Sequence, residues 1–216
     1  MKKLFVIIVS FVFSAAASAQ QNTRWGVVVG MNSSELTSSR YFDSRIGFHL
    51  GVKAEIGLPQ ITQGAYLETA ILLSLKGEKM SDEFDGEEVD GNSGVKINPY
   101  YLEVPVHIGY RYALNKNFNL FGSFGPYFAY GLFGKIKVNG IGDDGYSYHI
   151  KTDVFGSDTM KHFDFGLGGR IGAEFNNKIQ LSVGYDYGLT KPFSSDNASV
   201  YGKYNKNLSI SVAYMY

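Results

Sequence analysis

The stretch that decides the fold is K-H-F-D-F-G-L-G-G-R-I-G-A-E-F, residues 161–175. Apolar side chains alternate along it with positions that hold glycine, histidine or a charged residue. A period of two places successive side chains on opposite faces, which is the pattern of a β-strand. The polar face carries Asp164, Arg170 and Glu174 between glycines, whereas a sheet face that meets bulk water is typically built from Lys, Glu, Thr and Ser.

Glycine beside long charged side chains indicates what this polar face meets. Glycine weakens an ordinary strand and marks a place where space is short. The interior of an eight-stranded barrel is just wide enough for side chains to fill. We therefore expect the polar face to line a narrow lumen and the apolar face to meet lipid. Residues 45–57 and 180–188 repeat the pattern. A periplasmic or secreted β-sandwich, or a lipocalin-like barrel, is the alternative.

The same alternation predicts eight strands in a single antiparallel up-and-down transmembrane β-barrel, an all-β fold. The segments are 23–32, 45–58, 64–76, 100–112, a fifth from about 117 in which the parity is least clear, 161–175, 178–190 and 204–216. Their connections are alternately short and long, and the longest are 77–96 and 134–160. Bacterial outer-membrane barrels have this asymmetry, with short periplasmic turns and longer outer loops.

Residues 135–139 and 146–154 also alternate. We interpret them as a hairpin that extends the fifth and sixth strands beyond the membrane, with a bulge or kink at 155–159. A ten-stranded barrel is the alternative.

The N-terminus predicts export. Lys2 and Lys3 precede an apolar run at 4–13, and Ala-Ser-Ala at 17–19 is a small-x-small cleavage site. This is the pattern of a secretory signal peptide, residues 1–19, that is cleaved from a barrel domain at 20–216. An uncleaved N-terminal anchor is the alternative.

Composition excludes several classes of protein. Twenty basic and twenty acidic residues cancel, so no nucleic-acid partner is predicted. The chain has no cysteine, which excludes disulfides, thiolate metal sites and a lipoprotein anchor. The 26 glycines, 16 tyrosines and 16 phenylalanines suit an exported all-β protein better than a disulfide scaffold.

The charges on the predicted inner face balance. Six cations and six anions fall on it, and His107 and His162 share the same parity. The predicted luminal network is Arg24, Arg45, Lys53, Glu55, Glu68, Lys76, Glu103, His107, Arg111, His162, Asp164, Arg170, Glu174 and Asp186. Buried charges must be paired, so we expect salt bridges that plug the lumen. A wide ion-selective pore would show an excess of one sign.

Aromatic residues gather near the strand ends, as in the girdles at the two membrane interfaces. The predicted girdle is Trp25, Tyr100, Tyr101, Tyr110, Tyr112, Tyr185, Tyr187, Tyr214 and Tyr216.

Two stretches resemble the PorT-like outer-membrane β-barrel family. In that family a strand of the form Y-L-E-hydrophobic-P is followed by alternating apolar residues and a basic residue, which corresponds here to residues 101–105 and Arg111. A later glycine-rich strand with an inward acid and an arginine corresponds to Asp164 and Arg170. The resemblance covers essentially the whole mature chain and implies a small membrane barrel. The member that names the family is associated with protein secretion, so a secretion-system accessory is implied as one role.

No catalytic or metal site is predicted, and no cofactor. Glu103 and His107 are four residues apart on a strand, about 13 Å, which is too far to share a metal. His162 and Asp164, about 6.6 Å apart, could share a proton or a cation. His49, His107 and His162 are interpreted as luminal hydrogen-bonding groups.

Two further features bear on enzyme chemistry and on cation binding. The luminal serines Ser182 and Ser209 lie on strands without histidine, so a serine nucleophile has no base on its own strand. The acidic segment 81–94 is interpreted as a solvated outer loop, with weak divalent-cation binding that could bridge lipopolysaccharide phosphates as the alternative.

The predicted function is that of a structural or interaction protein with a plugged lumen. Its partners would be outer-membrane lipid and other envelope proteins that contact the outer loops. A small pore is the first alternative and a lipid-modifying enzyme the second.

Overall fold

A computed structural model describes residues 22–37, 42–80, 83–84, 87–88, 94–141, 147–156, 160–192 and 204–216. The predicted signal peptide and most of the acidic segment 81–94 lie outside these residues. Among the described residues, no helix is long and apolar enough to cross a membrane.

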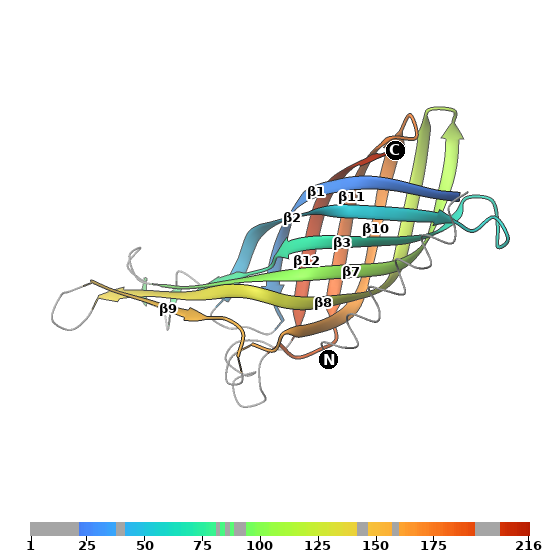
Figure 1. Ribbon diagram of the computed structural model, residues 1–216. Helices are drawn as coiled ribbons and strands as arrows, with labels where there is room; N and C mark the ends of the chain where they lie inside the picture. Colours follow the sequence, from blue (N-terminus) through green and yellow to red (C-terminus); the bar gives the residue numbers. More distant parts are fainter. Residues whose placement is uncertain are drawn as a thin grey trace.

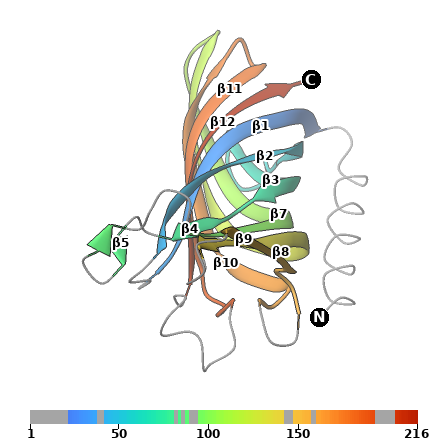
Figure 2. The ribbon, with the colours of Figure 1, turned by 90° about the vertical axis from the view of Figure 1, so that its left-hand side faces the viewer.

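Eight long antiparallel strands close into a barrel (Figures 1 and 2). They are β1 (Thr23–Leu36), β2 (Phe42–Gly57), β3 (Ala65–Leu75), β7 (Gly94–Asn115), β8 (Phe118–Ile141), β10 (Phe163–Phe175), β11 (Ile179–Gly188) and β12 (Asn205–Met215). Each pairs with the next in this order, and β12 pairs with β1. The prediction of a closed, eight-stranded, all-β barrel is confirmed.

The ten-stranded alternative is wrong because the additional strand does not enter the wall. Strand β9 (Ser147–Asp153) pairs with residues 135–141 of β8, while β10 pairs with residues 118–130 along the same edge of β8. β8 is therefore one long strand: its first part belongs to the barrel wall and its last part forms an outer hairpin with β9. This hairpin projects beyond the barrel on the left of Figure 1. The predicted break at 155–159 lies partly outside the described residues.

Three short strands, which the sequence did not predict, lie in the connection from β3 to β7. β4 (Glu78–Met80) pairs with the outer ends of β2 and β7. β5 (Glu83–Phe84) and β6 (Glu87–Glu88) pair only with each other among the described strands. They lie within the acidic segment that the sequence pattern assigns to a loop.

The connections sort by length between the two ends of the barrel, as predicted. The turns from β2 to β3, β7 to β8 and β10 to β11 lie at one end and the long connections at the other (Figure 1). The turn from β10 to β11 has positive φ at both of its central residues, 50° at Asn176 and 55° at Asn177, as a type I′ turn requires. The short-turn end is the periplasmic end of an outer-membrane barrel.

The two faces of the wall are inverted relative to a soluble protein. Large apolar side chains cover the outside, and Val29, Phe124 and Ile171 are exposed by 59%, 62% and 71%. The inner face instead buries charged and polar side chains. Such an apolar surface requires a nonpolar surrounding.

Strand β8 resolves the segment in which the parity was unclear. Leu120 and Phe124 face outward and are exposed, whereas Phe121 and Tyr127 face inward and are buried. Glycines leave room for these rings: a Cβ at Gly172 would overlap the Phe121 ring.

The outer hairpin leaves the barrel at a β-bulge. The register between β7 and β8 shifts by one residue, because Tyr101 pairs with Gly131 while Tyr100 pairs with Phe133. A bulge bends its strand and re-aims the side chains beyond it. Because of this bulge, the outward face of β8 changes from the even-numbered residues before it to the odd-numbered residues from Phe133 onward.

Candidate functional site

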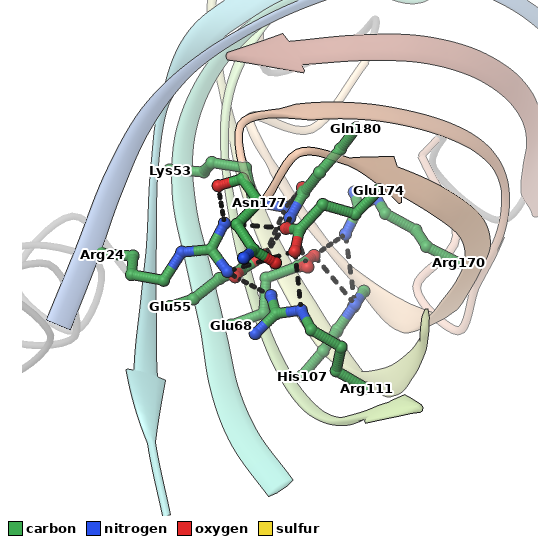
Figure 3. A network of polar contacts seen from close by, with 10 residues as sticks. All are labelled: Arg24, Lys53, Glu55, Glu68, His107, Arg111, Arg170, Glu174, Asn177 and Gln180. Carbon is green, nitrogen blue, oxygen red and sulfur yellow. Dashed lines mark hydrogen bonds and ion pairs between the residues drawn. The ribbon is translucent and has the colours of Figure 1, made fainter. Parts of the chain in front are cut away.

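The inner side chains form a network that joins opposite walls of the barrel (Figure 3). In its periplasmic half, Arg24 of β1 reaches Glu174 of β10 with an Nη2–Oε2 distance of 2.7 Å. Arg111 of β7 bridges two carboxylates, that of Glu55 on β2 and that of Glu174, to which its Nε lies at 3.3 Å. The side chains of Glu55 and Glu174 are 1% and 0% exposed, so the acidic ends of these ion pairs are buried while the arginines face the periplasmic mouth.

Lysine and amide groups connect these pairs to the middle of the lumen. Lys53 Nζ lies 3.1 Å from both Glu55 and Glu68, and it donates to Gln180 Oε1 at 2.9 Å. Gln180 in turn donates to Glu55 at 2.9 Å and to Glu174 at 2.7 Å. Strands β2, β3, β10 and β11 are thereby joined through one continuous set of contacts.

Arg170 and His107 complete this inner network. Arg170 Nη1 donates to Glu68 Oε1 at 3.2 Å and to His107 Nδ1 at 3.1 Å. An arginine can only donate, so Nδ1 of this fully buried histidine accepts and the ring proton resides on Nε2. His107 therefore acts as a neutral spacer between the walls.

A separate group of charges lies in the outer half of the lumen. Lys76 Nζ is 2.5 Å from Glu103 Oε2, and each side chain is 3% exposed. The ammonium also lies 4.6 Å from the centre of the Tyr127 ring, a favourable cation–π position. Lys76 and Glu103 thus form a buried ion pair, and neither has another salt-bridge partner among the described residues.

Not every predicted charge finds an ion-pair partner. Asp164 accepts hydrogen bonds from Tyr127 Oη at 3.1 Å, Thr190 Oγ1 at 2.6 Å and Asn205 Nδ2 at 2.8 Å. Asp186 accepts one from Asn207 Nδ2 at 3.2 Å. Neither acid has a described cation within salt-bridge distance, so the expectation that each acid forms an ion pair fails for these two. Hydroxyl and amide donors satisfy Asp164 instead, whereas Asp186 Oδ1 has no hydrogen-bond partner among the described residues.

Arg45 and His162 lie toward the rim rather than in the network. Arg45 Nη1 donates to the carbonyl of Ile97 at 3.4 Å. The His162 ring stacks between Tyr130 and Phe155, and its Nδ1 donates to Gly131 O at 2.7 Å. The hypothesis that His162 and Asp164 share a proton is therefore not supported by their partners.

One predicted girdle residue is misplaced. Tyr101 is 1% exposed and lies inside the barrel, where its ring packs edge-on against Phe155. Its position follows from parity, because its neighbour Tyr100 faces outward and stacks on Phe133. The other predicted girdle residues keep the outward parity: Trp25, Tyr110, Tyr112, Tyr185, Tyr187, Tyr214 and Tyr216.

A serine–histidine contact in the lumen was not predicted from the sequence. His49 Nε2 lies 2.9 Å from Ser211 Oγ, across the β1 strand from β2 to β12. The contact could have been anticipated, because both residues have inward parity and their strands, β2 and β12, both pair with β1. A cavity of about 30 Å³ lies beside them and beside Ser182, which is room for a water molecule but not for a lipid substrate. Ser209, the other predicted serine, reaches the Gly184 carbonyl at 3.4 Å.

The barrel also has a larger cavity at its periplasmic mouth. It measures about 230 Å³, and Arg24, Glu55, Tyr66 and Arg111 are among the residues that line it. The network closes its inner side. No group of three or more His, Asp or Glu residues in the described parts of the chain could hold a metal ion.

One family profile matches most of the chain. The profile of the family described as outer membrane protein beta-barrel domain matches residues 18–194. No curated protein matches the chain.

Solved structures that the comparison finds include a major outer membrane protein from Thermus thermophilus. It has 14% identity and a TM-score of 0.47, with 90% of this chain and 99% of that one covered. The attachment invasion locus protein Ail of Yersinia pestis, in complex with the heparin analogue sucrose octasulfate, has 14% identity and a TM-score of 0.43 at the same coverage. OprG from Pseudomonas aeruginosa has 13% identity and a TM-score of 0.38, with 90% of this chain and 94% of that one covered.

Proposed function

This chain belongs to the outer membrane protein beta-barrel domain family, and from that premise we propose that it is a closed, non-conducting barrel that serves as a structural or interaction protein through its outer extension. The protein resides in the outer membrane, where lipid covers its apolar wall. The proposal concerns what the barrel does there.

The observation that carries the proposal is the network across the lumen. Arg111 and Arg24 connect β7 and β1 to carboxylates on β2 and β10, and Gln180 of β11 ties those carboxylates to each other. An ion passing through would have to separate buried pairs. Separating such a pair leaves charges without their partners in a poorly solvated interior, which is unfavourable. The contacts across the lumen therefore favour a plug over a pore.

Conductance of purified protein in a planar lipid bilayer tests the plug. The wild-type barrel should show no reproducible unitary current. The double variant Glu55→Ser/Arg111→Ser removes the bridge between β7 and β2 in the periplasmic half of the lumen and should conduct more than the wild type. Both proteins must first show the gel-mobility change on heating that marks a folded barrel. Reproducible wild-type currents would establish the pore alternative and refute the plug.

An enzymatic role has little support from the lumen. The His49–Ser211 contact is the described arrangement closest to an activated nucleophile, and both residues are 6% exposed beside a cavity with room for a single water molecule. An acyl chain has no access to Ser211 Oγ there. Turnover of phospholipid or lipid A by the wild type, lost in Ser211→Ala, would overturn this assignment.

The outer hairpin is the part that we propose for interaction. β7, β8 and β9 continue the wall beyond the barrel as a paired sheet (Figure 1), so a rigid surface is held outside the membrane. The narrower resemblance to the PorT-like family makes a component of a secretion system the first class of partner to test. Photo-cross-linking from position Thr152 on β9 should capture an envelope protein, and cross-linking from Ile61 in a periplasmic turn should not capture the same one.

A further inference from the structure

Three lysines lie side by side on the outer hairpin and on the part of β7 that pairs with it. In the strand register, Lys96 of β7 pairs with Lys137 of β8, and Lys137 pairs with Lys151 of β9. Residues paired across antiparallel strands point to the same face, and all three side chains are exposed. We call these three residues the lysine row. Strand β4 places Lys79 at the next registered position beside Lys96.

The lysine row is unfavourable for the isolated protein. Like charges directly opposite each other destabilise a sheet, because their Cβ atoms are only about 5 Å apart. Two residues farther along β8 toward the barrel, opposite charges face each other instead: Lys135 pairs with Asp153, and their side chains form an ion pair at 2.6 Å. Among the described residues, no carboxylate is registered opposite a member of the lysine row. An external anion would relieve this repulsion.

The face on which the row lies indicates where that anion comes from. Lys96 shares the outward parity of Tyr100, whose ring stacks on Phe133 at a centroid distance of 4.8 Å. Lys96 is four residues beyond Tyr100, about 13 Å along the strand. With the strand tilt of such barrels, about 40°, this is about 10 Å farther from the membrane centre than the aromatic pair. Since aromatic belts mark the interface, the row stands just outside it, where the flexible lysine stems can reach back to headgroup phosphates.

Near the barrel, the opposite face of the hairpin is covered by apolar packing. Ile97 of β7 is buried there with Val154 and Met160, and Ile136 packs against them. The lysine row therefore looks toward the surrounding lipid and not toward the lumen axis.

We propose that the lysine row binds the phosphate groups of lipopolysaccharide in the outer leaflet. Adjacent strands are about 4.8 Å apart, so the outer two lysines are separated by about 10 Å at the backbone. Ammonium groups on flexible stems bind phosphate as adjustable point charges. A headgroup that carries more than one phosphate can contact two or three of them at once. This inference concerns the lipid contact and does not depend on whether the lumen conducts.

Calorimetric titration of the folded, full-length protein in detergent with purified lipopolysaccharide tests the proposal. The variant Lys137→Gln/Lys151→Gln should bind roughly 25-fold more weakly at low salt, because each lysine near an anionic surface contributes about fivefold. The matched control Lys116→Gln/Lys178→Gln changes the net charge equally at the exposed periplasmic turns and should change the affinity less than about twofold. Lys137→Arg/Lys151→Arg should retain binding.

Two further probes identify the ligand. Lipopolysaccharide from which the phosphates have been removed should bind the wild type as weakly as the intact lipid binds the double glutamine variant. Dextran sulfate stands for a soluble polyanion and should bind more weakly than lipopolysaccharide. The proposal is wrong if the glutamine variant binds like the wild type, if the periplasmic control loses as much affinity, if removal of phosphate has no effect, or if dextran sulfate binds while lipopolysaccharide does not.

Discussion

Replacing Lys76 by methionine removes the cation that contacts Glu103 in the described part of the chain. The two groups are 2.5 Å apart and each is 3% exposed, so the variant leaves a carboxylate buried without its counter-charge. Removal of one partner from a buried pair costs about 3–5 kcal/mol. The lost cation–π contact with Tyr127, 4.6 Å from the ammonium, acts in the same direction. We expect the free energy of unfolding to fall by about 4 kcal/mol.

Urea unfolding of the protein in lipid vesicles measures this loss. The single tryptophan, Trp25, lies on the lipid-facing wall and reports the transition through its fluorescence. With a denaturant slope of about 2 kcal/mol per molar urea, the midpoint should fall by about 2 M. The matched control Lys135→Met breaks an exposed ion pair and should lower the midpoint by less than about 0.5 M.

A second variant separates lost pairing from lost packing. In Lys76→Met/Glu103→Leu the uncompensated charge is gone, and apolar replacement of a whole buried pair is often neutral or stabilising. The double variant should therefore recover most of the midpoint. If Lys76→Met behaves like Lys135→Met, or if the double variant is as unstable as the single one, the ion pair does not have the role inferred here.

Three other substitutions test the wall and the rest of the network. Ile171→Arg on the lipid face should lower the unfolding free energy by about 3 kcal/mol in vesicles. The control Ile61→Arg lies in a periplasmic turn and should have almost no effect, although Ile61 is 70% exposed and Ile171 71%. Equal effects of the two variants would contradict the membrane orientation. Tyr127→Phe removes one of three hydrogen bonds to Asp164 and should cost about 2 kcal/mol by the same urea assay, so an unchanged midpoint would exclude this bond as stabilising. Arg111→Met leaves two buried carboxylates short of a partner and should cost about 3 kcal/mol, which an unshifted midpoint would refute.

Strand number and side-chain orientation were predictable because alternation is imposed by the backbone. Asp164, Arg170 and Glu174 face the lumen since every second residue of a strand must, and their charge requires an interior with partners. The long β8 strand was also anticipated, because residues 135–139 alternate with the same period beyond the membrane segment.

The errors arise where hydrophobicity does not distinguish the two faces. An aromatic ring suits both lipid and the packed interior, so Tyr101 in the lumen has the same sequence appearance as Tyr100 at the interface. Phe121 and Tyr127 on β8 blurred the parity for the same reason. The bulge between Gly131 and Phe133 adds a residue that no periodic pattern specifies.

Partner choice in the lumen was also beyond sequence reasoning. Charge balance predicts that the charges pair but not which ones meet, since that depends on how far the strands are staggered around the barrel. Asp164 illustrates the point, because a tyrosine, a threonine and an asparagine from three other places in the chain satisfy it.

The seam between β1 and β12 has a consequence for the order of folding. These strands pair from Gly26 with Met215 to Leu36 with Asn205, so the closing contacts join the two ends of the barrel sequence. The other wall pairs link strands that follow one another in the chain, and short loops close at little entropic cost. Contacts between distant segments form late. The hairpins should therefore assemble first into an open, curved sheet, with two unpaired edges that remain exposed until the seam forms.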